Sequence, residues 1–380
     1  MNILFLTAYP PVLHMHGGGV LMFHNIRILG EKHNVRVISF VESDEERAML
    51  DSLSGICESV TAVRRIPDFR PHWLSLLPFL VREFSTPEMY QAVEKEFQRK
   101  RVDVIFCAYL QMAQFYRRSV LNILSLPETL SANAYDDFLR AVDPIEKLRA
   151  YYRWMGVLRY EVLMSRKFDR VVAMTDRDAE YLRSYSTNAN ITAIPIGIDL
   201  DEFSPWPEDS TRPVEVLFLG NFRHTPNVEA GEFLVRMIAP LFPDVPFAIS
   251  GGNVPDSLRV GSNVHFPGYA RDVRDLYRRP NTIVAAPLFS GTGQRVKLLE
   301  AFAMGCPVIT TSIGASGFPI TQGIEAVIAD NSTDFASRLK ELLSSESLRS
   351  QMGAKARHMI ERHFSWDSLA PRLLGLLERS

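Results

Sequence analysis

Residues 282–317 read TIVAAPLFSGTGQRVKLLEAFAMGCPVITTSIGASG, and this stretch decides the fold. It begins with a short apolar run, Thr282–Ala286, whose composition predicts a buried strand. A glycine-containing loop follows, and a helical pattern starts at about Gln294. The next apolar run, Pro307–Thr311, predicts another strand. A helix between two buried strands is typical of a parallel sheet, because the helix returns the chain to the starting edge.

The same alternation extends through the chain in both directions. Towards the N-terminus it predicts the strands Ile3–Thr7, Val35–Phe40, Val102–Cys107, Arg170–Met174 and Ile191–Pro195. Between these strands, helical spacing covers Val20–Lys32, Pro87–Lys100, Asp143–Lys167 and Asp176–Tyr185. The rhythm restarts with the strands Val214–Leu219, Phe247–Ser250 and, after the opening stretch, Ala326–Ala329. We therefore expect an α/β protein with two doubly wound, Rossmann-like parallel-sheet domains facing across a cleft.

The length of 380 residues also favours two domains, and a polar, proline-rich segment (Pro205–Pro213) has the composition of a linker. We place the boundary near Gly197, which gives domains of residues 1–197 and 198–364. The last helix, residues 365–380, has an apolar stripe that must pack on something: Trp366, Leu369, Leu373, Leu374 and Leu377.

Composition excludes several classes of protein. Forty-two basic and 44 acidic residues give a net charge of −2, which argues against a globally basic nucleic-acid-binding protein. Three widely separated cysteines exclude a thiolate zinc cage and argue against a disulfide framework. The first residues lack the basic start of a signal peptide, and no apolar run has the length of a membrane span. We expect a cytoplasmic protein.

The loop and helix start after Thr282–Ala286 have the features of an anion site. Arg295 and Lys297 fall in the expected first turn, where a cation opposes the helix dipole. An anion held there removes this conflict, and a diphosphate fits cationic side chains combined with backbone donors. The backbone donors are expected from Gly291, Thr292, Gly293 and Gln294.

Glu300 lies one turn after Lys297 and could accept hydrogen bonds from ribose hydroxyls. The alternative is an ordinary surface ion pair between Lys297 and Glu300, worth a few tenths of a kcal/mol.

A second glycine-rich segment follows the first strand. Gly17, Gly18 and Gly19 precede a helical pattern and would let backbone N–H groups approach an anion. The spacing is not that of a dinucleotide fingerprint. A loop that merely turns the chain is the alternative. His16 is a candidate acid/base group that touches substrate, or else a polar loop residue.

The segment SGTGQRVKLLEAFAMGCPVITTSIGASGF resembles the nucleotide-diphosphate signature of the GT-B retaining glycosyltransferases of family 4, the group 1 transferases. FDRVVAMTDRDAEYL, IPIGIDLDEFSP, VLFLGNFRHTPNVEA and FSWDSLAPRLLGLL resemble further segments of that family in the same order. The resemblance implies an acceptor-side N-terminal domain, a C-terminal domain that binds the nucleotide sugar, and a last helix that packs back on the first domain.

The chain departs from the family pattern at three places. The first of two glutamates that are eight positions apart is replaced by Thr292, while Glu300 matches the second. Arg223 only loosely matches a basic residue expected after the first strand of the second domain. A histidine expected near the end of the fifth N-domain strand is absent, and Asp136 or Asp137 is the candidate for a neighbouring role.

The resemblance implies a hexosyl-type transferase that moves a sugar from a UDP- or GDP-linked donor to a hydroxyl on a glycan, a lipid-linked or a small-molecule acceptor, with retention. The expected catalytic residues are Arg295, Lys297, His16 and Asp136, with Arg223 as a further donor-binding candidate. Because side chains supply the cations, we expect no metal and no cofactor. Asp199-Leu200-Asp201 resembles a metal-binding DxD motif, but it lies in a hinge-like segment.

Two segments interleave basic and aromatic residues, Arg64–Arg82 and Lys147–Arg170. This composition suits peripheral contact with an anionic membrane, at its inner face, or a lipid-linked acceptor. It equally suits a solvated helix face over a core stripe. Two other functions remain open for the whole chain: a nucleotide-sugar epimerase of the same architecture and a non-catalytic nucleotide-sugar binder.

Overall fold

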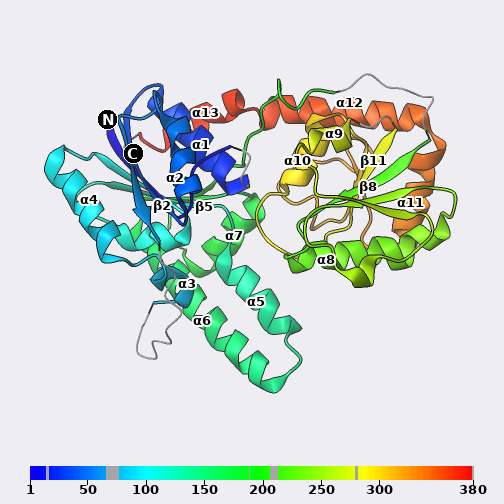
Figure 1. Ribbon diagram of the computed structural model, residues 1–380, viewed down its shortest axis with the longest axis horizontal. Helices are drawn as coiled ribbons and strands as arrows, with labels where there is room; N and C mark the ends of the chain where they lie inside the picture. Colours follow the sequence, from blue (N-terminus) through cyan, green and yellow to red (C-terminus); the bar gives the residue numbers. More distant parts are fainter. Residues whose placement is uncertain (14–16, 66–76, 188, 206–212, 279–280, 379–380) are drawn as a thin grey trace. The chain divides into compact units, whose positions relative to one another are not determined.

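The computed structural model describes residues 1–13, 17–65, 77–187, 189–205, 213–278 and 281–378. The chain separates into two compact units (Figure 1). The N-terminal unit comprises Met1–Ile196, Thr292–Gln294 and Leu369–Ser380. The C-terminal unit comprises Gly197–Gly291 and Arg295–Ser368.

The N-terminal unit is built on a seven-stranded parallel sheet in the order β3-β2-β1-β4-β5-β6-β7. The interior strand β1 pairs on both sides, with Ile3 opposite Val35 on β2 and Val104 on β4. Its strands are β1 (Asn2–Thr7), β2 (Asn34–Val41), β3 (Ser59–Arg64), β4 (Val104–Ala108), β5 (Leu121–Leu126), β6 (Arg170–Ala173) and β7 (Ile191–Ala193).

Helices cover both faces of this sheet, and several begin at a side-chain cap. Thr86 accepts a hydrogen bond from Met89 N at the start of α4, and Thr175 accepts one from Asp178 N at the start of α7. The helices are α1 (Gly17–Gly30), α2 (Asp44–Met49), α3 (Phe79–Arg82), α4 (Pro87–Arg99), α5 (Leu130–Arg140), α6 (Pro144–Lys167), α7 (Asp176–Tyr185) and, from Leu369 on, α13 (Trp366–Gly375).

A buried ion pair joins α4 to β2. Arg36 is 1% exposed, and its Nη1 lies 2.5 Å from Glu96 Oε2 and 3.2 Å from the Glu96 carbonyl oxygen. Its Nη2 donates to the Arg101 carbonyl oxygen at 3.3 Å. A buried guanidinium needs this many acceptors because desolvation of the charge is costly.

The C-terminal unit repeats the design with a six-stranded parallel sheet in the order β10-β9-β8-β11-β12-β13. Its strands are β8 (Glu215–Leu219), β9 (Phe247–Ser250), β10 (Val264–Gly268), β11 (Thr282–Ala286), β12 (Val308–Thr310) and β13 (Val327–Ile328). The helices are α8 (Thr225–Glu232), which runs on into a π-helical segment (Phe233–Ile238), then α9 (Arg274–Tyr277), α10 (Val296–Ala303), α11 (Ser332–Ser344) and α12 (Glu346–His363).

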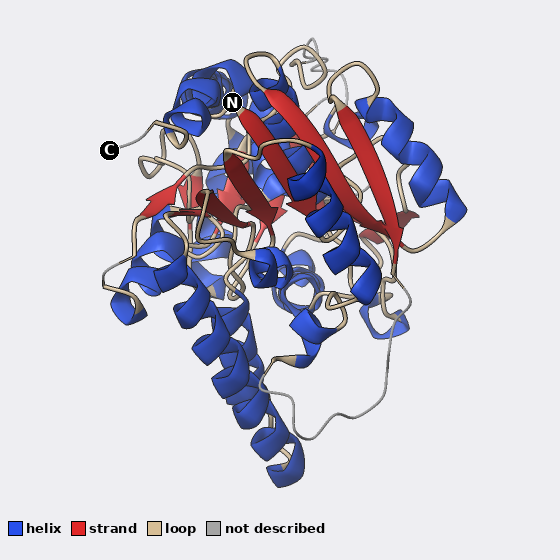
Figure 2. Ribbon diagram, turned by 90° about the vertical axis from the view of Figure 1, so that its left-hand side faces the viewer, coloured by secondary structure: helices blue, strands red, loops and turns tan. Residues whose placement is uncertain are grey.

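The α/β class and the two doubly wound parallel sheets predicted from the sequence are confirmed. Figure 2 shows helices on both sides of the strands of the N-terminal unit. Over the described ranges, no helix combines the length and the apolar character that a bilayer crossing requires.

Candidate functional site

The start of α10 and the carboxyl end of β8 meet within the C-terminal unit. Ligands of open parallel sheets bind at this edge, where strand-to-helix loops and helix N-termini converge. The sequence predicted a helix from about Gln294, but α10 begins at Val296 and Arg295 is its N-cap residue. The reason is the backbone of Arg295, whose φ of −84° and ψ of 88° are not helical. Lys297 lies in the first turn, as expected.

Arg295 stabilises the loop that leads into α10 through hydrogen bonds. Its Nη2 donates to the carbonyl oxygens of Ser290, at 3.1 Å, and Gly291, at 2.7 Å. Gly291 has a φ of 96°, a conformation that glycine adopts without strain. The hydroxyl of Ser290 donates to Glu229 Oε2 on α8 at 2.9 Å. The cation is thereby held at the N-terminal end of α10.

Lys297 reaches from α10 to the carboxyl end of β8. Its Nζ donates to Asn227 Oδ1 at 2.6 Å and lies 4.6 Å from the centroid of the Phe218 ring. Desolvation, and then the positive charge of Arg295, lower the pKa of Lys297 to about 7. The ammonium group therefore changes charge near neutral pH unless an anion binds beside it.

Backbone donors at the same helix end complete the anion site. Within the described ranges, the N–H groups of Val296 and Lys297 form no hydrogen bond, whereas those of Leu298 and Leu299 bond to the Arg295 carbonyl oxygen. A helix N-terminus with open N–H groups and two nearby cations is suited to a phosphate group.

Glu300 is held by a tyrosine from α9. The Tyr277 hydroxyl lies 3.1 Å from Glu300 Oε2 and 2.9 Å from the Lys297 carbonyl oxygen. Desolvation raises the pKa of Glu300 to about 7, and the Tyr277 hydrogen bond only partly offsets this rise. Among the described residues Lys297 and Glu300 form no ion pair, so the surface-pair alternative from the sequence is wrong.

The other predicted donor-site residues lie in the loop between β8 and α8 and in the loop before α10. Arg223 is exposed in the loop between β8 and α8, where its N–H donates to Asn221 Oδ1 at 3.1 Å. Thr292, Gly293 and Gln294 group with the N-terminal unit. Gly293, like Gly291, has a positive φ, of 75°. Its N–H donates to Asp178 Oδ2 at 3.1 Å, so the prediction that Gly293 offers a backbone donor to an anion is wrong.

The predicted glycine loop after the first strand is not a loop in the structure. Gly17, Gly18 and Gly19 form the first turn of α1. A Cβ on Gly19 would lie 2.7 Å from the Val12 carbonyl oxygen, so its absence of a side chain permits close packing. His16 lies outside the described residues.

Asp136 lies on α5 and is partly exposed. Its neighbour Asp137 forms an ion pair with Arg153 on α6 at 3.8 Å. Both aspartates lie on α5, and the catalytic role predicted for them stays a prediction.

Two carboxyl groups near the carboxyl edge of the N-terminal sheet, one half-buried and one fully buried, were not predicted from the sequence. Glu128 lies two residues after the end of β5, accepts a hydrogen bond from Asn133 Nδ2 at 2.9 Å, and has its pKa raised by desolvation. Glu161 is fully buried and accepts hydrogen bonds from Leu130 N, at 3.1 Å, and the Ser131 hydroxyl. Burial raises its pKa to about 7. No sequence signal was available for Glu128, because β5, the strand that precedes it, was not predicted either.

The DxD-like segment has a local structural role. Asp199 Oδ1 accepts hydrogen bonds from Asp201 N, at 2.9 Å, and Glu202 N, at 3.1 Å, which closes a turn. Within the described part of the chain, no three His, Cys, Asp or Glu side chains are placed to hold a metal ion together.

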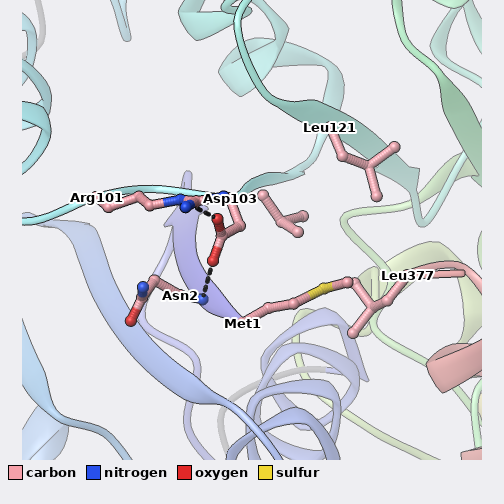
Figure 3. A pocket seen from close by; sticks show the side chains of 7 residues that line it. Met1, Asn2, Arg101, Asp103, Leu121 and Leu377 are labelled. Carbon is pink, nitrogen blue, oxygen red and sulfur yellow. Dashed lines mark hydrogen bonds and ion pairs between the residues drawn. The ribbon is translucent and has the colours of Figure 1, made fainter. Parts of the chain in front are cut away.

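A hollow at the other edge of the N-terminal sheet carries less chemistry. Figure 3 shows Asp103 between two donors, Asn2 N at 2.9 Å and Arg101 Nε at 2.7 Å, with Leu121 and Leu377 on the wall. It lies at the amino ends of β1, β4 and β5, opposite the edge where ligands of parallel sheets bind.

Two family models match the chain. Residues 15–202 match the model described as Glycosyltransferase Family 4, and residues 213–345 match the model described as Glycosyl transferases group 1. A D-inositol 3-phosphate glycosyltransferase from Mycolicibacterium smegmatis is 27% identical over 239 residues, which are 56% of this chain and 53% of the relative. The chain spans about half the length of the curated relatives it matches.

Solved structures show the same fold. Sucrose-phosphate synthase from Thermosynechococcus elongatus is 15% identical and matches over 99% of this chain and 98% of that chain, with a TM-score of 0.75. HepE of Anabaena, solved in complex with UDP, is 13% identical and matches over 99% of both chains, with a TM-score of 0.70. With its two parallel sheets and both family models in chain order, the protein belongs to glycosyltransferase family 4, the glycosyl transferases group 1, and has the GT-B fold.

Proposed function

We propose that the protein transfers a sugar from a nucleoside-diphosphate donor to a hydroxyl acceptor, and that the start of α10 binds the diphosphate. The observation that carries the proposal is the convergence of Arg295, Lys297 and open backbone N–H groups at that helix end. Family membership and the UDP complex of HepE support it.

The chemistry follows from where charge develops. Cleavage of a glycosyl–phosphate bond leaves positive charge at the sugar C1 and negative charge on the departing diphosphate. Positioned cations and N–H donors stabilise that negative charge more in the transition state than in the ground state. Lys297 is suited to this role, since a bound diphosphate raises the pKa of its ammonium and keeps it charged.

Glu300 is proposed to hold the ribose of the donor. Tyr277 contacts Glu300 Oε2 and so orients the carboxylate. The donor base is proposed to be uracil or guanine. Because side chains supply the positive charge, the proposal includes no divalent metal and no cofactor, and activity should persist in EDTA.

The acceptor is proposed to be a hydroxyl on a glycan, a lipid-linked or a small molecule, bound by the N-terminal unit. Retention of the anomeric configuration is proposed from the family, and NMR of the product anomer would test it. We also propose a cytoplasmic enzyme with peripheral contact to an anionic membrane.

The test starts with a thermal-shift screen of UDP, GDP and ADP and their sugars, since a ligand of the native state raises its melting point. Donor turnover is then measured for the wild type, Lys297→Met and a control, Lys340→Met, which removes an exposed lysine on α11. We expect Lys297→Met to lower kcat about 100-fold at unchanged thermal stability. Full turnover in that variant would contradict the proposal.

Acceptor-free assays separate the alternatives. Isomerisation of the donor sugar without acceptor would indicate an epimerase. Donor binding without any turnover, across acceptors of all three classes, would indicate a nucleotide-sugar binder.

A further inference from the structure

Helices α5 and α6 form an antiparallel pair that extends away from the sheet of the N-terminal unit (Figure 1; the view in Figure 2 agrees). Three residues connect them, and Asp143 caps α6 by accepting hydrogen bonds from Ile145 N and Glu146 N. With 24 residues, α6 is about 36 Å long.

One face of α6 packs against α5. Ala150 and Val157 are buried, and the Trp154 ring lies 4.7 Å from the ring of Tyr135 and is stacked on Phe138. This buried face is the core stripe that was one of the two interpretations of the segment Lys147–Arg170.

A second apolar stripe runs along the opposite side of α6. Its spacing of three, four and three residues places the side chains on one face, about 180° from the buried stripe. All are exposed, by 40% to 67%: Ile145, Leu148, Tyr152 and Met155. At the tip of the pair, Val142 is 93% exposed and Leu139 is 55% exposed. A row of exposed apolar side chains of this kind is typical of an interaction site.

Helix α6 itself has a net positive charge. Helix α6 contains six basic and two acidic residues, a net charge of +4 in a chain whose net charge is −2. All six basic side chains are exposed, but one of the two acids, Glu161, is buried. Glu146 is therefore the one acid that α6 itself presents to solvent, and it pairs with Arg149 at 2.6 Å. Beside α6, Asp137 on α5 pairs with Arg153 at 3.8 Å, and the cap residue Asp143 is exposed.

We propose that the outer face of α6 docks on an anionic lipid bilayer, with Leu148 and Tyr152 in the boundary between headgroups and acyl chains and the arginines on lipid phosphates. Apolar side chains flanked by basic ones are the pattern of helices that lie in the membrane interface. A second copy of the chain is disfavoured as the occupant, because it would bring together two helices that each have a net positive charge. This docking surface rests on the membrane contact included in the proposed function, and binding to the bilayer through it requires no nucleotide sugar.

Vesicle flotation without nucleotide tests the docking surface. We expect the full chain to float with phosphatidylglycerol/phosphatidylcholine vesicles and to stay unbound with phosphatidylcholine alone. Leu148→Gln/Tyr152→Gln should lower the partition coefficient about tenfold or more. Arg149→Gln/Arg153→Gln/Arg159→Gln should lower it about 100-fold, from about fivefold per basic side chain.

Matched controls make the same chemical changes elsewhere. Met237→Gln/Leu241→Gln removes two apolar side chains of similar exposure, and Lys340→Gln/Lys355→Gln/Arg362→Gln removes three exposed positive charges. Both should bind as the wild type does, and circular dichroism checks that each variant is folded.

Three outcomes would overturn the inference: no flotation of the wild type, equal loss in the control variants, or concentration-dependent self-association that Leu148→Gln/Tyr152→Gln abolishes. Each readout is independent of donor turnover. Failure of the docking surface therefore leaves the proposed sugar transfer untouched, and the reverse also holds.

Discussion

The affinity for a nucleoside diphosphate should pass through a maximum near pH 7, because two groups of the site ionise in opposite senses. The pKa of Lys297 is lowered to about 7, so its charged form is present below that pH. The pKa of Glu300 is raised to about 7, so its charged form is present above it. If binding requires both charges, affinity falls about threefold within one pH unit on either side and approaches tenfold per unit beyond.

Single variants separate the acidic and the alkaline side of this pH dependence of the affinity. In Glu300→Gln only Lys297 titrates, and the apparent Kd should rise about fivefold from pH 7 to 8 and about tenfold from pH 8 to 9. In Lys297→Met the alkaline limb should vanish, and loss of the charged contact should weaken binding about 10- to 100-fold.

Isothermal titration calorimetry with UDP and GDP from pH 6 to 9 measures these constants. The double variant Lys297→Met/Glu300→Gln reports the titration of the ligand itself and is the control. An alkaline limb that persists in Lys297→Met, or a flat profile in Glu300→Gln, would refute the assignment of the anion site to this lysine.

Other substitutions test the packing around the site. Gly19→Ala should lower the Tm, because the new Cβ would lie 2.7 Å from a backbone oxygen. Gly156→Ala lies in open space within α6 and should raise the free energy of unfolding by about 0.5–1 kcal/mol. Thermal melts of the two variants test both predictions. Glu96→Ala should cost about 3–5 kcal/mol in urea unfolding, because it leaves Arg36 buried without its carboxylate, and a loss below about 1 kcal/mol would argue against the buried pair. The pKa of Glu161 is raised from 4.5 to about 7 in the folded state. The wild type should therefore lose about 3 kcal/mol of its free energy of unfolding as the pH rises from 4.5 to 7. Glu161→Gln should lack this loss when unfolding is measured across the same pH range.

Sequence reasoning found the central strands because both of their faces are buried, which produces uninterrupted apolar runs. It missed β3 and β10, whose residues are mostly half-buried or exposed and therefore form no such run. It also missed β5, where Asn122 and Ser125 interrupt the apolar pattern. Asn122 is buried because its Nδ2 donates to the carbonyl oxygens of Arg117 and Val120, a compensation that no local pattern reveals.

The site was predictable to the extent that it is local in sequence. Arg295, Lys297 and Glu300 follow one another on a single loop and helix, so their clustering could be inferred. Their partners could not: Asn227 lies 70 residues before Lys297, and Tyr277 lies 23 residues before Glu300. Only the pairing of β8 with β11 brings such distant segments to one edge of the sheet.

The N-terminal unit is not continuous in sequence, since it includes residues from Leu369 on, and Arg372 donates to the Ala193 carbonyl oxygen within it. During synthesis this unit therefore stays incomplete until its last segment, which follows the whole C-terminal unit in sequence, has been translated. Leu369, Leu373 and Leu377 are buried in the finished protein, so the nascent N-terminal unit exposes their apolar docking surface until they emerge. The unit that is synthesised first is thus completed last, and until then an apolar surface that the finished protein buries stays open to solvent.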